Sequence, residues 1–217
     1  MPAHAAADCA EPPAPRVTLA RTFAEPVIDT SLGLAALQAL PRSGTAAAPG
    51  IGHLLGLTSA RAAGSFDVEY DAPAGAPGGA VCGAARQVKL QLGFDEVVIH
   101  IAREATGDRC LYAEIYAHES RHVQVDRDML AQYGPWFETR LRQAVIAIGA
   151  VRGGSLDAVS DVIQQRIQAA FNDAFALFQQ EVDRRQRLID TPEEYRRMSL
   201  VCDAAGGRLV TRQRPGG

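Results

Sequence analysis

The chain has 217 residues, of which 47% are hydrophobic and 22% charged, and its formal net charge is −3. These values are those of an ordinary soluble globular protein with an apolar core. The slightly acidic balance gives no basic surface, so we expect no nucleic-acid partner. The longest apolar run, AVIAIGAV at 144–151, is far shorter than the roughly 18 residues of a membrane-spanning helix, so we expect no membrane span.

The ends of the chain are expected to lie outside the folded domain. We predict an irregular lead-in at 1–15, a single domain at 16–203 and a flexible tail at 204–217. Within the first residues, MPAHAA, Ala3-His4-Ala5 fits the small-x-small pattern before a signal-peptidase cleavage site. We interpret this as a remnant of a signal sequence and expect a periplasmic or secreted protein; an alanine-rich irregular start is the alternative.

The N-terminal half is predicted to be rich in strands. Residues 16–23 and 64–70 alternate apolar and polar side chains, as strands do, and a short helix is predicted at 31–40. Two further strands, 87–92 and 96–102, are separated by Gly93-Phe94-Asp95 and are predicted to form a hairpin. On its second strand, His100 is predicted to be an exposed histidine rather than a metal ligand.

The cysteines point to disulfide bonds. Cys9, Cys82, Cys110 and Cys202 are an even number, and no two are arranged as C-x-x-C. Three pairings can be drawn. The predicted hairpin brings Cys82 and Cys110 to its open end, so we expect a Cys82–Cys110 bond and, by remainder, a Cys9–Cys202 bond.

The most informative stretch is His118-Glu119-Ser120-Arg121-His122. On an α-helix, histidines at i and i+4 lie on one face and can bind one cation. The carboxylate of Glu119 beside them can take a proton from a water molecule that the metal has made acidic. This is the H-E-x-x-H pattern of zinc peptidases, and it predicts one Zn²⁺ per chain. Two histidines packed on an amphipathic helix are the alternative.

A catalytic zinc ion needs a third protein ligand. We predict a helix from about 109 to 133 that pauses or kinks at Gly134-Pro135 and resumes from 136 to about 151, and a second helix from 156 to about 189. A short turn would pack them antiparallel and place residues near 184 opposite residue 120. Glu181 falls on the apolar stripe of the second helix, so it is the predicted third ligand.

Other acidic residues remain alternatives for this position. Glu194 and Asp190 are the other candidates for the third ligand, although Glu194 also fits a capping box that begins at Thr191. Asp126 is expected behind the ligands or at the surface. Tyr195 is a candidate donor to the negative charge that develops during hydrolysis.

With these residues in view, the chain resembles zincin metallopeptidases with a gluzincin-like arrangement. More narrowly, it resembles the bacterial family of predicted secreted zinc-dependent proteases, over about 25–197. The matching stretches are GLTSARAAGSFDVEYDAPAG, the following Cys82 with RQVKLQL, HESRHVQVD and RQRLID. Among these, only H-E-x-x-H is a specific motif. The family often ends its long helix with Tyr-Asp and a Thr-x-His-Gly turn, where this chain has LIDTPEEYRR without a histidine. The resemblance implies zinc and proteolysis.

We therefore expect an α+β fold: a small antiparallel sheet in the N-terminal half, then the H-E-x-x-H helix packed antiparallel on a long C-terminal helix, as in zincins. The expected function is that of an exported zinc endopeptidase acting on a protein or peptide substrate, which would add as a strand along 96–102. In this reading His118, His122 and Glu181 bind the metal and Glu119 is the general base. A zinc amidase acting on cell-wall peptides and a non-catalytic helical binding protein are the alternatives.

Overall fold

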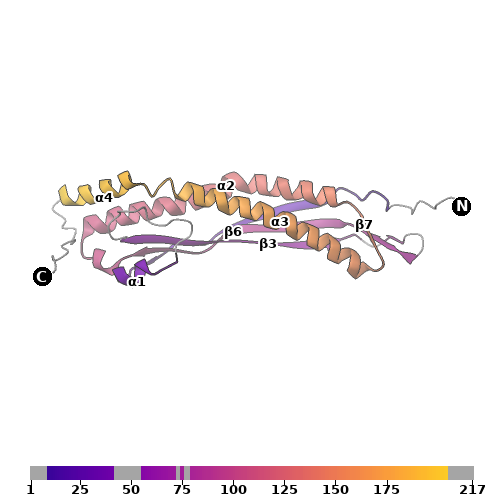
Figure 1. The fold of residues 1–217 in the computed structure, drawn as a ribbon, viewed down its shortest axis with the longest axis horizontal. Coiled ribbons are helices and arrows are strands. Elements are labelled where there is room, and N and C mark those ends of the chain that lie inside the picture. The colour runs from indigo at the N-terminus through magenta and orange to yellow at the C-terminus, as the bar shows by residue number, and fades with distance from the viewer. Residues whose placement is uncertain (1–8, 42–54, 72–73, 76–78, 205–217) are drawn as a thin grey trace. The chain divides into compact units, whose positions relative to one another are not determined.

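The protein has a mixed α+β fold, as expected. The computed structural model describes residues 9–41, 55–71, 74–75 and 79–204 (Figure 1). The signal-like residues 1–6 and the tail beyond residue 204 lie outside this described part. In chain order the elements are β1 (Arg16–Phe23), β2 (Val27–Asp29), α1 (Leu34–Gln38), β3 (Gly56–Tyr70), β4 (Ala74–Gly75), β5 (Val81–Gly83), β6 (Ala85–Ile101), the 3₁₀ helix η2 (Arg103–Ala105), α2 (Arg109–Ile148), β7 (Val151–Gly153), α3 (Leu156–Gln186) and α4 (Pro192–Ala204).

The chain divides into two compact units, and the long elements β3, β6, α2 and α3 contribute to both. The first unit consists of residues 1–22, 62–93 and 129–180, and the second of 23–61, 94–128 and 181–217. The H-E-x-x-H motif and every residue predicted to act with it belong to the second unit.

The first unit has an aromatic core between strands and helices. The ring of Phe171 from α3 contacts Phe66 of β3 and Phe137 of α2, in each case with 5.4 Å between ring centroids. Phe137 is fully buried and Phe171 nearly so, which removes their large apolar surfaces from water. A second small sheet of this unit, in the order β4-β5-β7, is antiparallel.

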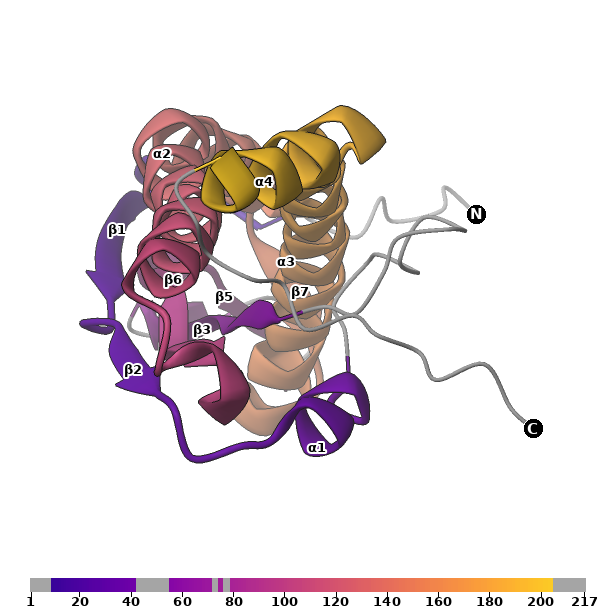
Figure 2. The ribbon, with the colours of Figure 1, turned by 90° about the vertical axis from the view of Figure 1, so that its left-hand side faces the viewer.

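The second unit places strands β2, β3 and β6 beneath the first part of α2 (Figure 2). Val97, Ile99 and Ile101 of β6 are buried and alternate with partly exposed residues, as expected for a strand with one face in a core. Ile115 and Val123 are buried on α2. Close approach of β3 to α2 depends on Gly56, where an added Cβ would lie 2.5 Å from Ile115 and 2.6 Å from Glu119.

The main sheet is mixed, so the prediction of an antiparallel sheet was wrong in this respect. β6 pairs with β1, β2 and β3, and β2 runs parallel to β6 with Asp29 opposite His100. Because β6 is paired on both sides, residues 96–102 do not offer the free edge that we expected a substrate strand to use.

The predicted hairpin around Gly93-Phe94-Asp95 is also wrong, because β6 runs on from residue 85 to 101. The buried side chains are even-numbered from Val88 to Phe94 and odd-numbered from Val97 to Ile101, so one extra residue shifts the alternation. The extra residue is accommodated at Glu96, whose φ of 53° is the left-handed conformation found in β-bulges. A bulge and a turn both interrupt the period of two, and the sequence pattern alone does not separate them.

Because the predicted hairpin does not form, the disulfide pairing also differs from the predicted one. Cys82 and Cys110 lie beyond opposite ends of β6, and the structure pairs Cys9 with Cys82 and Cys110 with Cys202 instead. The predicted pairing was therefore wrong. Each observed bond stays within one unit, and Cys110–Cys202 joins the first turn of α2 to α4.

The two long helices run antiparallel, as predicted. In the first unit, residue numbers rise along α2 while their contacts fall along α3, from Tyr133 with Phe178 to Phe137 with Phe171. The helix α2 continues through Pro135 rather than pausing there. No helix among the described residues has the length and apolar character to cross a membrane.

Candidate metal centre

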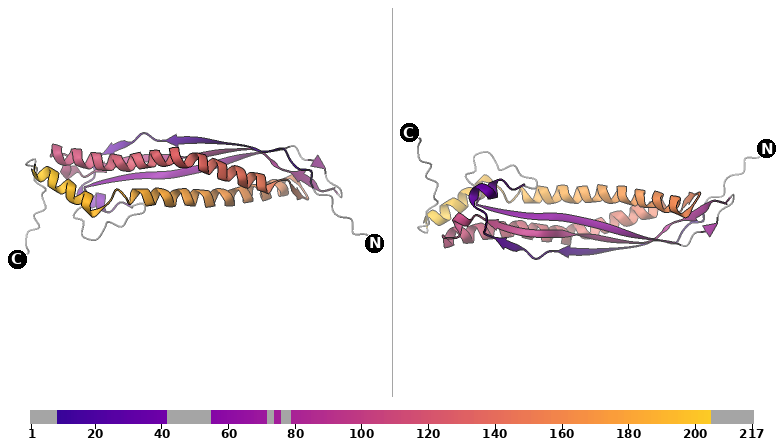
Figure 3. Two further views of the ribbon diagram at one scale, coloured as in Figure 1. Left: turned by 90° about the horizontal axis from the view of Figure 1, so that it is seen from above. Right: turned by 90° about the horizontal axis from the view of Figure 1, so that it is seen from below.

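Two histidines of α2 meet one aspartate from the turn between α3 and α4. His118 and His122 lie one helical turn apart on α2, and both are buried. Asp190 is partly exposed and lies just before α4, which runs beside the first part of α2 (Figure 3). Among the described residues, these three form a group whose ligand atoms lie close enough together to hold one metal ion.

The spacing of the three ligand atoms fits a tetrahedral ion. His118 Nε2 lies 3.1 Å from Asp190 Oδ1, His122 Nε2 lies 3.2 Å from the same oxygen, and the two nitrogens are 3.3 Å apart. With metal–ligand bonds of about 2.0 Å, as zinc makes with nitrogen and oxygen, neighbouring corners of a tetrahedron are about 3.3 Å apart. The three atoms therefore form one face of such a tetrahedron and leave its fourth corner for water or substrate.

Hydrogen bonding alone accounts poorly for Asp190 Oδ1. This single oxygen is also the acceptor for the hydroxyl of Tyr195 at 2.8 Å. Donation by both histidines as well would bring three donors to an atom with two lone pairs. A cation in place of the two ring protons would bind both imidazoles and the carboxylate and leave the tyrosine bond intact.

His122 is held in the tautomer that metal binding requires. The side-chain amide of Gln186 donates to the backbone oxygen of His122 at 3.1 Å and to Asp126 Oδ1 at 2.7 Å. Its own oxygen therefore faces His122 Nδ1, 2.6 Å away, and accepts the proton of that nitrogen. With the proton on Nδ1, the Nε2 lone pair points at the metal position.

His118 has two neighbours on its other nitrogen. Arg121 Nη2 lies 3.0 Å from His118 Nδ1, and Glu194 Oε1 lies 3.7 Å from it. Arginine only donates, so a metal on Nε2 requires the Nδ1 proton to turn to Glu194, whose carboxylate lies just beyond hydrogen-bond distance and would have to move closer to become the acceptor. Hydrogen bonds from Arg197 first, and from Arg121, lower the pKa of Glu194 to about 2, so this acceptor is ionised. Arg121 and Glu194 form an ion pair across α2 and α4.

Electrostatics in the site favour a bound cation. Burial alone would raise the pKa of Asp190, but hydrogen bonds from His118 and His122 outweigh it and hold the pKa well below its usual range. Burial lowers the pKa of His122, yet Asp190 and Glu119 raise it on balance. The site thus holds a carboxylate that attracts positive charge beside an imidazole, and either a proton or a metal ion can supply that charge.

Glu119 lies beside the ligands on the same helix and is 3% exposed. The hydroxyl of Thr58, on β3, shares its single proton between Glu119 Oε2 at 2.9 Å and the Glu119 backbone oxygen at 3.0 Å. Burial raises the pKa of Glu119, against the lowering effect of His122 and His118. A carboxylate with a raised pKa accepts a proton more readily than an exposed one, as a general base must.

Asp126 lies behind the ligands, connected to His122 through Gln186. It is 2% exposed, and burial raises its pKa to about 7, more than the Gln186 hydrogen bond lowers it. Asp126 was expected either behind the ligands or at the surface, and the structure places it behind the ligands.

The structure brings Asp190, and not Glu181, to the two histidines. Glu181 pairs with Arg184 and Arg185 on its own helix, and these bonds, with Arg184 first, lower its pKa to about 2. The third-ligand prediction assumed that the ligand lies on the helix itself. Because α3 ends at Gln186, the turn after it carries Asp190 back to α2 instead.

Thr191 caps α4 as predicted, its hydroxyl accepting the Glu194 N–H at 3.2 Å. Tyr195, predicted as an oxyanion donor, donates to Asp190, and its ring lies 5.4 Å from that of His118. The residue that sequence reasoning missed is Gln186, because nothing in the sequence marks a glutamine as a partner of a histidine sixty-four positions away.

No family model matches the chain, and no curated protein and no solved structure was found to be similar to it.

Proposed function

We propose that the protein is an exported zinc-dependent peptidase, with His118, His122 and Asp190 as the metal ligands and Glu119 as the general base. The observation that carries this proposal is the triangle of ligand atoms with sides of 3.1 to 3.3 Å on an H-E-x-x-H helix. Two imidazoles and one carboxylate suit zinc better than magnesium or calcium, which prefer oxygen ligands.

The described residues divide the work of hydrolysis between them. A bound zinc ion would polarise the peptide carbonyl and make a water molecule acidic. Glu119 takes the proton of the attacking water and passes it to the leaving amine. Thr58 fixes the carboxylate of Glu119, and Gln186 fixes the ring of His122, so neither group has to be ordered during the reaction.

The disulfides support an exported protein. All four cysteines form bonds, Cys9–Cys82 and Cys110–Cys202, which fits an extracellular or otherwise oxidising compartment. The proposed location is the periplasm or the cell exterior, with a protein or peptide as substrate. A zincin-like packing of α2 against α3 is part of the same proposal.

Metal content tests the site. The purified chain is reconstituted with zinc, freed of excess ion and analysed by elemental mass spectrometry beside three variants. We expect one zinc per chain in the wild type and in Glu181→Ala, and little in His122→Ala or Asp190→Ala. Glu181→Ala is the matched control, because its carboxylate pairs with arginines outside the cluster. A wild-type chain that retains no metal would contradict the proposal.

Hydrolysis tests the reaction. The zinc-loaded wild type should cleave an unfolded protein such as casein, and a chelator should stop the cleavage reversibly. Glu119→Gln should retain zinc and lose roughly a hundredfold to ten-thousandfold in rate. Cleavage of cell-wall amides but not of proteins would assign the same site to an amidase. Equal activity of wild type and Glu119→Gln would refute the assigned role of Glu119.

A further inference from the structure

We propose a second reactive site in the same unit: Asp29, His100 and Ser59 form a nucleophilic triad in which Ser59 accepts an acyl group from esters of small apolar acids. Ser59 Oγ lies 3.1 Å from His100 Nε2, and His100 Nδ1 lies 3.1 Å from Asp29 Oδ2. A nucleophile bonded to a base, with that base bonded to a carboxylate, is the arrangement that activates serine in hydrolases on unrelated folds.

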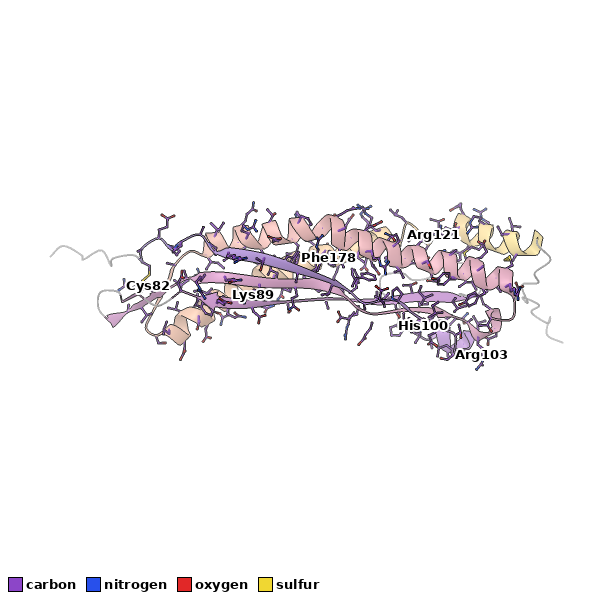
Figure 4. All side chains as sticks on the ribbon, turned by 180° about the vertical axis from the view of Figure 1, so that it is seen from behind. Cys82, Lys89, His100, Arg103, Arg121 and Phe178 are labelled. Carbon is purple, nitrogen blue, oxygen red and sulfur yellow. A yellow bond between two sulfur atoms is a disulfide. The ribbon has the colours of Figure 1, made fainter. Side chains whose placement is uncertain are left out.

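Three adjacent strands hold this triad. Asp29 is on β2, His100 on β6 and Ser59 on β3, and β6 pairs with both of the other strands. Asp29 stands directly opposite His100 in the parallel register. His100 lies between the buried Ile99 and Ile101, and its side chain is on the side of the strands away from α2 (Figure 4). The triad is therefore separate from the metal centre, which lies on α2.

The hydrogen bonds select the tautomer that a general base needs. The pKa of Asp29 is lowered, chiefly by its hydrogen bonds with the side chain and backbone of Ser31, so its carboxylate only accepts. The Ser31 N–H donates to Asp29 Oδ1 at 2.8 Å, so Asp29 Oδ2 is the oxygen that accepts from His100. His100 Nδ1 must then carry the proton, and in the neutral ring Nε2 accepts the hydroxyl proton of Ser59.

Access and surroundings fit a small apolar substrate. The side chain of Asp29 is 29% exposed and that of His100 is 13% exposed, so the triad is partly open to solvent. Ser59 is partly exposed as well. Val27 lies two residues before Asp29 on β2, on the same face, and is 61% exposed, which offers an apolar contact to an acyl chain.

The reaction balances without a cofactor. Ser59 Oγ bonds to the ester carbonyl carbon, its proton passes to His100 Nε2, and the alcohol leaves with that proton. Water then attacks the acyl-serine ester and loses a proton to His100 Nε2; the bond between the carbonyl carbon and Ser59 Oγ breaks, the acid leaves, and the proton on His100 passes to Ser59 Oγ. Asp29 is a positioning residue, because it acts on His100 rather than on the substrate.

The test is labelling of the intact, disulfide-bonded chain by a fluorophosphonate, which forms an Oγ–P bond with an activated serine and releases fluoride with the serine proton. Intact mass should show one adduct, and peptide mapping should place it on Ser59. Ser59→Ala should abolish labelling, while Ser65→Ala, on the same strand, should label like the wild type. A folded wild type that stays unlabelled, or a Ser59→Ala variant that still labels, would overturn the proposal.

Variants of the other two residues separate a triad from ordinary cross-strand bonding. His100→Asn should lower the labelling rate by about a hundredfold or more. Asp29→Asn should lower it similarly, because an asparagine amide donates to Nδ1 and moves the ring proton to Nε2, and Asp29→Glu should restore part of the loss. Equal rates in all of them would overturn the proposal. Labelling should not respond to a zinc chelator, so this site and the proposed metal centre can fail independently.

Discussion

Gln186 Oε1 accepts the Nδ1 proton of His122 at 2.6 Å, and this contact determines which nitrogen of the ring can bind a metal ion. The amide of Gln186 is itself oriented by Asp126 and by the backbone oxygen of His122. A residue at the end of α3 thus controls the chemistry of a ligand on α2.

Gln186→Ala should weaken zinc binding. Loss of the acceptor frees the His122 ring to rotate and to place its proton on Nε2, which typically costs tenfold to a hundredfold in affinity. Competition with a chromophoric chelator measures the change. Gln124→Ala removes an exposed glutamine of α2 whose amide donates to Asp128, and it should leave the affinity unchanged. Unchanged affinity in Gln186→Ala would show that the contact does not orient the ring.

Glu194→Gln should also weaken zinc binding, by roughly tenfold, because it removes the negative charge 3.7 Å from His118 Nδ1 and leaves Arg121 without its counter-ion. Glu193→Gln is the matched control, since Glu193 is 72% exposed and pairs with Arg196 at the surface. The same chelator competition applies to both. Equal losses in the two variants would assign the effect to α4 as a whole rather than to Glu194.

Gly56→Ala should impair hydrolysis more than metal binding. The added methyl group would meet Ile115 and Glu119 Oε1 at distances that require one of them to move. A displaced Glu119 leaves the ligands in place but is a poorer general base. Gly107→Ala adds a methyl group that meets nothing within 4 Å and should behave like the wild type. Cleavage rate and zinc content, measured on the same samples, distinguish this result from unfolding, in which both would fall.

Asp126 should make the metal-free protein less stable as the pH rises. Its pKa is about 7 in the folded state against an ordinary value of 3.8, so the folded state holds an extra proton between these values. Stability from this group is complete below pH 3.8 and is lost as the pH passes through 7, by up to about 4 kcal/mol for the full shift. Asp126→Asn should flatten that fall in urea unfolding at pH 5 and 8.

Asp128→Asn is the control for this experiment, because Asp128 is an exposed residue of the same helix. It should leave the dependence of stability on pH unchanged. If wild type and Asp126→Asn lose stability in parallel between pH 5 and 8, Asp126 does not titrate in this range.

The local elements could largely be predicted from the sequence. The strand at 16–23 and the start of a helix at residue 109 agree with β1 and α2, because side-chain alternation and helical periodicity depend on neighbours along the chain. The cap at Thr191 was predictable for the same reason. The partnership of His118 with His122 follows from their spacing alone, whatever the rest of the fold does.

The tertiary structure alone decided the rest. The sequence could not distinguish the bulge at Glu96 from a turn. The predicted disulfide pairing depended on that turn, so it was wrong as well. The third member of the metal cluster comes from a turn in which Asp190 has no periodic signal. Asp29, Ser59 and His100 meet only because their strands pair. Contacts between distant segments depend on register and chain reversal, which no local pattern records.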